Sequence, residues 1–135
     1  MRYEVPEWLL ARFDRAFGEL ADSELAALSQ EAGLDLRVNI LKASRDDVLA
    51  RLTEEELSPT LTPYSPWGLR LPARVALGSH TGFQEGIFEV QDEASQLCAL
   101  LVDASAGHAV LDLCAGAGGK TLAIAAAMGN KGRIV

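Results

Sequence analysis

A glycine-rich turn joins an apolar run to a helix-forming run at residues 110–121, Val-Leu-Asp-Leu-Cys-Ala-Gly-Ala-Gly-Gly-Lys-Thr. Residues 109–113 are apolar apart from Asp112, which is typical of a buried parallel strand. The alanine-rich run from Lys120 onward favours a helix. A helix that begins directly after such a turn presents unpaired N–H groups and a partial positive charge. The spacing therefore predicts a site for the polar or anionic end of a nucleotide-like ligand.

Three ligand classes compete for this turn. A P-loop requires a glycine at position 114, where this chain has Cys114. A dinucleotide fingerprint requires its third glycine at position 121, where the chain has Thr121. A site for S-adenosylmethionine asks for an acidic residue near the strand end and small residues in the turn, and Asp112 with residues 115–119 meets both demands. The alternative that the turn binds nothing stays open at this point.

Length and composition limit the kind of protein. The chain has 135 residues, of which 49% are hydrophobic, so it holds enough apolar residues for a core. No apolar run approaches the roughly 18 residues of a membrane span, and the N-terminus has no apolar signal region. Cys98 and Cys114 lack metal-ligand spacing, and two isolated thiols suit a reducing, cytoplasmic setting.

The net charge of −7 is unevenly distributed. Residues 1–33 carry three basic and seven acidic side chains, residues 34–80 six of each, and residues 81–135 three basic and six acidic ones. Nucleic-acid-binding domains usually present a basic face, and none is evident here. Charge alone therefore argues against tight, autonomous RNA binding.

The first eighty residues alternate between helix and strand patterns. We predict helices over 7–20 and from Asp22 or Ser23 to Gly33, with an aromatic stripe that packs in the core or, alternatively, contacts a partner. Residues 34–41 alternate as a half-buried strand, and Ser44 is placed to cap a short helix. The polar side chains of this segment either contact phosphates or face solvent; they are Arg37, Asn39, Lys42 and Arg45.

The proline-rich stretch that follows excludes continuous helix and predicts short edge strands over 60–64 and 67–71. A further strand or a single helical turn is expected over 74–77, and a loop over 78–86. We place a domain boundary near residue 80. His80 and His108 are expected to be loop residues rather than catalytic ones.

The last third reads as the opening of a parallel sheet. A strand over 87–90 precedes a helix with its apolar face on Ala94, Leu97, Cys98, Leu101 and Val102. After the glycine turn, a helix over 120–128 leads to a second parallel strand at 133–135. The chain stops within that strand, so the predicted sheet has bare edges and we expect self-association.

Two motifs, in this order, resemble the Sun family of RNA (cytosine-5) methyltransferases. The first is Gly82-Phe-Gln-Glu-Gly-Ile-Phe-Glu-Val-Gln-Asp-Glu-Ala-Ser-Gln-Leu97, and the second is the turn at 111–121. The strand Leu36-Arg-Val-Asn-Ile-Leu-Lys42 also resembles the family's N-terminal domain. The family's turn typically reads D-x-C-A-A-P-G-G-K-T, and here Gly116 and Ala117 replace its Ala and Pro. Both replacements are small, so we expect the turn to survive with more backbone freedom.

The resemblance implies that S-adenosylmethionine lies along the turn. The residues it assigns to the cofactor are Cys114, Ala115, Gly116, Ala117, Gly118, Gly119 and Lys120. In the family a cysteine thiolate attacks carbon-6 of a cytosine so that carbon-5 accepts the methyl group, and a second cysteine assists release. Those cysteines lie in Pro-Cys and Thr-Cys motifs that this chain does not contain. The resemblance therefore implies no catalytic residue and no metal ligand in this chain, and Cys114 belongs to the binding turn.

We therefore predict an α/β chain with two parts. Residues 1–80 form a small RNA-recognition-like domain that engages RNA, and residues 81–135 form the first βαβ portion of an incomplete Rossmann-like, S-adenosylmethionine-dependent methyltransferase domain. The predicted function is cytosine-5 methylation of RNA, probably of ribosomal RNA, in the cytoplasm, with the isolated chain inactive. The alternatives are a non-enzymatic RNA-binding or assembly module with a vestigial methyltransferase start and, less favoured, a dehydrogenase- or NTPase-type nucleotide-binding domain.

Overall fold

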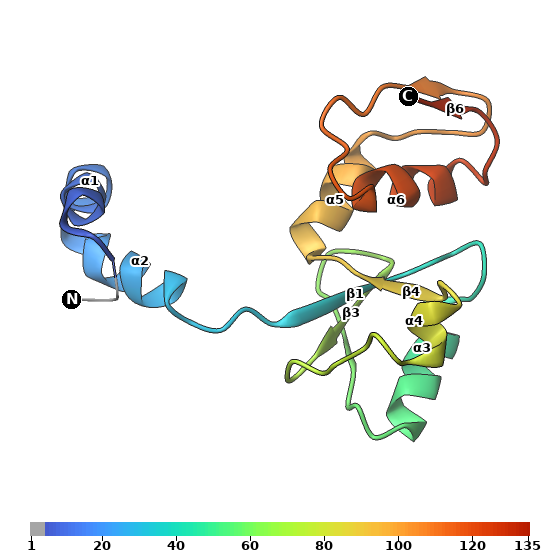
Figure 1. Cartoon of the computed structure of the whole chain (residues 1–135), viewed down its shortest axis with the longest axis horizontal. Helices are drawn as coiled ribbons and strands as arrows, with labels where there is room; N and C mark the ends of the chain where they lie inside the picture. Colours follow the sequence, from blue (N-terminus) through green and yellow to red (C-terminus); the bar gives the residue numbers. More distant parts are fainter. Residues whose placement is uncertain (1–4) are drawn as a thin grey trace. The chain divides into compact units, whose positions relative to one another are not determined.

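A four-stranded antiparallel sheet is the framework of the structure, a computed structural model that describes residues 5–135 (Figure 1). Its strands lie in the order β2-β3-β1-β4. Their bounds are Leu34–Val38 for β1, Thr60–Leu61 for β2, Gly68–Leu71 for β3 and Phe88–Val90 for β4. Leu36 of β1 lies opposite Leu69 of β3 on one side and Val90 of β4 on the other. β1 is therefore an inner strand, which explains why its residues 35–38 are all buried instead of alternating as a half-buried strand.

One face of this sheet packs on a helix and forms the larger core. Ser44 caps helix α3 (Arg45–Glu54) as predicted, because its hydroxyl oxygen accepts the Asp47 N–H at 3.1 Å. The short helix α4 (Thr81–Gln84) lies where the sequence predicted only loop, and contacts β4. The core residues come from the sheet, from α3 and from the connection after β3: Leu36, Val38, Val48, Leu52, Leu69, Leu71, Leu77 and Phe88.

The opposite face of the sheet is polar and faces helix α5 (Glu93–Leu101). Asp92 caps this helix through the N–H groups of Ala94 and Ser95. The predicted apolar face of α5 is wrong. The helix buries Glu93, Gln96 and Ala99 instead, and Leu101 is 83% exposed. The reason is that the two polar side chains find hydrogen-bond partners on the small sheet, so the helix turns that face inward.

A second, two-stranded sheet confirms the predicted βαβ unit. β5 (Ala109–Val110) and β6 (Arg133–Ile134) are parallel and are joined by helix α6 (Gly119–Ala127). α5 and α6 lie side by side in Figure 1 and share a small core of Ala99, Ala123, Ile124 and Met128.

Residues 1–32 form a compact unit of their own, and residues 33–135 form the other. The first unit contains α1 (Glu7–Phe17), the 3-10 turn η2 (Gly18–Leu20) and α2 (Ala21–Leu28). α2 ends well before Gly33, and no side chain caps its start, so the predicted cap at Asp22 or Ser23 is wrong. The predicted boundary near residue 80 stays a prediction.

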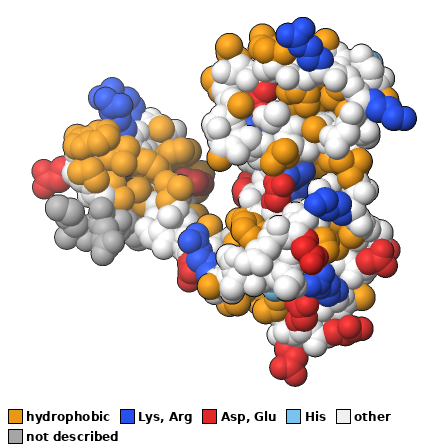
Figure 2. All heavy atoms as spheres, turned by 45° about the vertical axis from the view of Figure 1, so that its right-hand side comes forward, with side chains coloured by type: hydrophobic (Ala, Val, Ile, Leu, Met, Phe, Trp, Pro, Cys, Tyr) orange, Lys and Arg blue, Asp and Glu red, His pale blue; other side chains and the backbone are white. Residues whose placement is uncertain are grey.

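The aromatic stripe of the first unit is not a core in this structure. α1 contains no buried residue, and Trp8 is 62% exposed beneath the guanidinium of Arg12. Figure 2 shows apolar side chains gathered on the surface of this unit, which include Trp8, Phe17, Leu20 and Leu28. No helix among residues 5–135 is both long and apolar enough to cross a membrane.

Two smaller expectations also differ from the structure. β3 was predicted as an edge strand but lies between β2 and β1, so only β2 of that predicted pair is at an edge. Residues 74–77 form neither a strand nor a helical turn. Proline at the flanks of β3 suggested an edge, yet the residues of the strand itself, Gly68–Leu71, contain no proline and pair on both sides.

Candidate functional site: the glycine-rich turn

The glycine-rich turn begins after β5 and ends at the first residue of α6. Gly116 has φ +56° and Gly118 has φ +85°, both in the left-handed region that side chains disfavour. The Gly118 N–H donates to the Ala115 carbonyl at 2.9 Å, which tightens the turn directly before the helix. Glycine is therefore required at 116 and 118 by backbone conformation, as the sequence predicted for a sharp turn.

The seven residues predicted to bind the cofactor lie together on one surface segment. Cys114, a free thiol, and Lys120 are exposed, and Gly119 is the first residue of α6. The others complete the turn between them: Ala115, Gly116, Ala117 and Gly118. The segment is thus open to a ligand along its length, and its assignment to a cofactor stays a prediction.

Asp112 is fixed by a residue on the far side of the turn. The Thr121 hydroxyl donates to Asp112 Oδ2 at 2.6 Å, and the Asp112 N–H donates to the Val135 carbonyl at 2.8 Å. The sequence singled out Asp112 as the acidic residue near the strand end. It missed the role of Thr121, whose hydroxyl orients that carboxylate; the nine-residue separation of the two gives no helical or strand periodicity that would reveal the pair.

Gln91 lies against the first residue of α6. A Cβ atom built on Gly119 would stand 3.2 Å from Gln91 Nε2, so the glycine at 119 makes room for the glutamine. Gln91 is buried, and its Oε1 atom has no hydrogen-bond partner among the described residues. The motif that contains Gln91 was part of the family resemblance, but its contact with the turn is visible only in the structure.

A cavity of about 410 Å³, here called the turn cavity, connects the turn to the small sheet. It is lined on one side by Ala117 and Gly119 and on the other by Phe83, Glu89 and Val90. A different cavity, of about 240 Å³, lies between α6 and β6 and is not lined by any residue from 114 to 120. The turn cavity is therefore the space through which a ligand on the turn reaches the small sheet.

The four polar side chains predicted either to contact phosphates or to face solvent are engaged inside the chain. Arg37 forms an ion pair with Glu89 at 2.5 Å, and Asn39 Nδ2 donates to the Gly86 carbonyl at 2.9 Å. Lys42 donates to the Glu85 carbonyl, and Arg45 donates to the Ser65 carbonyl at 3.1 Å. These contacts tie β1 and the segment after it to the loops around them, so this segment is not a freely solvated basic face.

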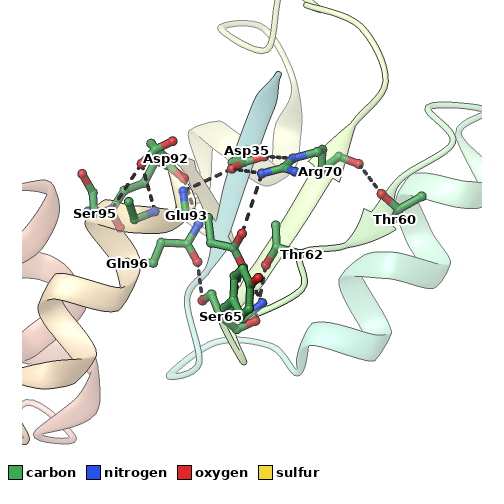
Figure 3. A network of polar contacts seen from close by, with 12 residues as sticks. Asp35, Thr60, Thr62, Ser65, Arg70, Asp92, Glu93, Ser95 and Gln96 are labelled. Carbon is green, nitrogen blue, oxygen red and sulfur yellow. Dashed lines mark hydrogen bonds and ion pairs between the residues drawn. The ribbon is translucent and has the colours of Figure 1, made fainter. Parts of the chain in front are cut away.

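A buried polar cluster joins the small sheet to α5 (Figure 3). Arg70 donates to both carboxylate oxygens of Asp35, at 2.6 and 2.8 Å, and the Glu93 N–H donates to Asp35 at 3.1 Å. The Glu93 carboxylate accepts the N–H groups of Tyr64 and Ser65 at 2.7 and 2.8 Å. The cluster thus fixes the start of α5 on the sheet.

Gln96 extends this cluster into the sheet. Its Oε1 accepts the Ser65 hydroxyl at 2.7 Å, and its Nε2 donates to the Leu36 and Gln91 carbonyls at 3.2 and 2.8 Å. α5 in turn packs on α6. The glycine turn therefore has a defined position relative to the small sheet within residues 33–135.

Charge pairing shifts the pKa values of two carboxylates in the cluster. The Arg70 hydrogen bonds lower the pKa of Asp35 despite its burial. Burial of Glu93 raises its pKa, but the N–H groups of Ser65 and Tyr64, together with Thr62 and Arg70, outweigh burial, and the net pKa lies below the ordinary value. Both carboxylates are therefore anions at neutral pH.

His80 is a capping residue, in agreement with its expected place outside any catalytic site. Its Nδ1 accepts the Gly82 N–H at 3.0 Å at the start of α4, and its Nε2 lies 2.5 Å from Glu55 Oε2. Hydrogen bonding to His80, and then to Arg51, lowers the pKa of Glu55. His108 accepts the Ser105 N–H at 3.3 Å within its own loop.

The antiparallel sheet with its covering helices, followed by a βαβ unit that carries the glycine turn, defines a class of mixed α/β chains. A family model described as the ferredoxin-like domain of RsmF/B-like methyltransferases matches residues 5–77, more than half of the chain. The chain belongs to this family of methyltransferases. The resemblance to the Sun family is thereby confirmed.

Curated relatives agree with this assignment. The chain is 38% identical over 135 residues to a probable ribosomal RNA small subunit methyltransferase B of Synechocystis, covering 98% of this chain and 30% of that protein. It is 38% identical over 120 residues to ribosomal RNA small subunit methyltransferase B of Proteus mirabilis, covering 89% of this chain and 28% of that protein. The chain thus spans less than a third of the length of these relatives.

Solved structures share the fold. A methyltransferase homolog from Pyrococcus horikoshii matches with a TM-score of 0.86 at 28% identity, covering 98% of this chain and 44% of that one. The structure of NSun6 from Pyrococcus horikoshii with SFG matches with a TM-score of 0.86 at 19% identity, covering 96% of this chain and 57% of that one. At that identity the second match shows the fold alone.

Proposed function

We propose that this chain supplies the RNA-engaging domain and the cofactor-binding turn of a methyltransferase that uses S-adenosylmethionine to methylate carbon-5 of a cytosine in small-subunit ribosomal RNA. One observation carries the proposal: a strand, a turn with glycines in the left-handed region at 116 and 118, and a helix follow each other in a chain of this family. The names of the relatives support ribosomal RNA as the substrate. The two free cysteines agree with a cytoplasmic setting.

The residues of the turn fit S-adenosylmethionine. When bound, the cofactor supplies a methyl group that an electron-rich carbon accepts. The unpaired N–H groups at the start of α6 favour the negatively charged carboxylate at the amino-acid end of the cofactor. The backbone at Gly116 and Gly118 allows close approach because no Cβ stands in the way. Thr121 holds the Asp112 carboxylate at the strand end, where it accepts hydrogen bonds from the cofactor.

This chain does not contain the residues that activate the cytosine. The family's Pro-Cys and Thr-Cys motifs are absent from its sequence, so we expect the chain alone to be inactive. Cys114 is exposed but lies in the binding turn, and we assign it no role as nucleophile. The role of the chain is to bind and orient, and the chemistry belongs to the remainder of a longer protein.

A chimera tests this proposal. The matching N-terminal segment of the Synechocystis relative is replaced by this chain, and transfer of radiolabelled methyl groups to small-subunit ribosomal RNA is measured, with 5-methylcytosine identified by mass spectrometry. We expect methylation by the chimera and at least a hundredfold loss in its Gly118→Val variant. The Gly107→Val chimera is the matched control, because Gly107 also has a left-handed φ of +89° but lies outside the turn.

Two results would contradict the proposal. A folded chimera that transfers no methyl group, while the unmodified relative does, would leave the non-enzymatic RNA-binding or assembly module as the better interpretation. Equal activity of the Gly118→Val and Gly107→Val chimeras would show that the turn does not bind the cofactor.

A further inference from the structure

A second cavity adjoins the turn cavity and contains a buried arginine. This arginine cavity, of about 110 Å³, is lined by Arg37 and Glu89 on the sheet and by Leu122 and Asn130 on or just after α6. Glu89 and Leu122 line both cavities, so the two are neighbours along α6. A ligand in the arginine cavity therefore lies next to the space that leads to the glycine turn.

Arg37 has hydrogen-bonding capacity that the chain does not use. Its side chain is 3% exposed, its Nη2 pairs with Glu89 Oε2, and its Nε is buried with no hydrogen-bond partner among the described residues. A buried N–H group without an acceptor is costly, and few occur in folded proteins. An acceptor atom supplied by a ligand in the arginine cavity would satisfy this donor.

The charges and shape of the arginine cavity identify the kind of ligand. Glu89 neutralises Arg37, so the pair offers little net attraction for a phosphate. The pair instead presents a donor beside a carboxylate acceptor, which matches the mixed donor and acceptor edge of a nucleobase. Leu41 and Leu122 are about half exposed and supply apolar walls for the faces of a ring. A dry cavity of roughly 150 Å³ accepts benzene, so this volume suits one ring better than two.

We propose that the arginine cavity binds a pyrimidine base of a single-stranded RNA segment that runs on toward the glycine turn. This inference rests on the proposed function for its choice of RNA. The base edge meets Arg37 Nε and the Glu89 carboxylate, and Asn130 contributes a carboxamide at the rim. Recognition through a neutral pair also explains how a chain with a net charge of −7 engages RNA without a basic face.

Binding of short fluorescent oligonucleotides to the whole chain tests the inference. We expect oligouridine or oligocytidine of eight nucleotides to bind at least fivefold more tightly than oligoadenosine. The Arg37→Gln/Glu89→Gln double variant keeps the net charge and removes both partners of the base edge, and it should lose about tenfold in affinity for the pyrimidine strand. The matched control is Arg51→Gln/Glu55→Gln, which removes another Arg–Glu pair, located on α3 and just after it and lining neither cavity.

A second variant and a spectroscopic signal protect the test from misfolding. Asn130 has φ +55°, so Asn130→Gly keeps its backbone and removes only the carboxamide, with an expected loss of about threefold. The Arg37 Nε–H resonance of the unmodified chain should shift on addition of cytidine. A pyrimidine affinity unchanged in the folded double variant, a preference for oligoadenosine, or no binding of any single strand would overturn the inference.

The outcome is separable from that of the chimera. An active chimera together with unchanged binding by the double variant would remove the inference and leave the proposed function intact. Pyrimidine binding that depends on Arg37 together with an inactive chimera would retain the cavity and remove the methyltransferase assignment.

Discussion

The polar face of the small sheet carries two cross-strand ion pairs that are completed differently. Asp35 receives two hydrogen bonds from Arg70 and a third from the Glu93 N–H. Arg37 receives one partner, Glu89, and keeps a buried Nε without an acceptor among the described residues. The first pair lies beneath the first turn of α5, whereas the second borders the arginine cavity beside α6.

This difference separates a structural role from a binding role on one face. A buried polar cluster stabilises a fold only when every member is satisfied, because each unsatisfied group carries its full desolvation cost. The Asp35 cluster meets this condition and attaches α5 to the sheet. The Arg37 pair does not meet it, so its residues contribute less to stability and remain available to a ligand.

The largest expected effect comes from removing the carboxylate that closes the Asp35 cluster. Glu93→Ala leaves the N–H groups of Tyr64 and Ser65 buried without their acceptor and should lower the free energy of unfolding by about 3 kcal/mol. Urea unfolding followed by circular dichroism measures this change. Glu54→Ala is the control, since Glu54 is exposed on α3 and should change stability by less than about 0.5 kcal/mol. Equal effects of the two variants would show that the cluster is not structural.

Acid should weaken the same cluster next. The pKa of Asp35 is lowered by hydrogen bonds from Arg70, and the pKa of Glu93 is lowered by the Ser65 and Tyr64 N–H groups in spite of burial. The unfolded chain, with carboxyl pKa values near 4, therefore binds protons first as the pH falls. Stability should be complete above about pH 5 and decline toward pH 2 as the pH passes through the lowered folded values. Glu93→Gln should flatten this decline, whereas Glu54→Gln should leave it unchanged.

Local patterns were enough to predict most elements of residues 33–135. The apolar run at 109–113, the turn glycines and the alanine-rich run after them predicted the βαβ unit, because each depends on neighbours in sequence. Ser44 was identified as a cap for the same reason. The seven candidate cofactor residues also form one continuous segment, as their sequence order requires.

Contacts between distant segments could not be predicted in this way. The hydrophobic pattern of α5 pointed to Leu101, but Glu93 and Gln96 are buried because their partners lie about thirty and sixty residues away. The same limitation applies to Arg37, which an alternating pattern assigned to a polar surface and which β4 and α6 bury. Sequence periodicity reports which side chains are polar, and only the tertiary fold shows which of them are paired.

A smaller effect is expected from the Arg37 pair itself. Because its Nε is already unsatisfied and Glu89 is partly exposed, Arg37→Met should lower the free energy of unfolding by only about 1 kcal/mol. Arg37→Met/Glu89→Leu should be neutral or stabilising, since the replacement removes both charges and fills the site with apolar groups. Urea unfolding of the two single variants and the double variant gives the coupling energy. A coupling as large as the effect of Glu93→Ala would show that the two pairs are equivalent and would end the distinction drawn between them.

The smallest expected effect concerns Gln91, whose N–H donates to the Asp35 carbonyl at 3.0 Å and whose side chain reaches the glycine turn. Gly119→Ala improves helix propensity by up to about 1 kcal/mol, but its Cβ would lie 3.2 Å from Gln91 Nε2. Gln91 is held by its backbone and by Gln96, so we expect the contact to cancel the gain and the variant to be neutral or slightly destabilised.

In a Gln91→Ala background the same substitution should stabilise the chain by about 0.5–1 kcal/mol, because the obstructing amide is gone. Thermal unfolding of the four proteins in this cycle measures the sign change. Stabilisation by Gly119→Ala in both backgrounds would mean that Gln91 moves aside freely, and the glutamine would then not hold the turn in place relative to the small sheet.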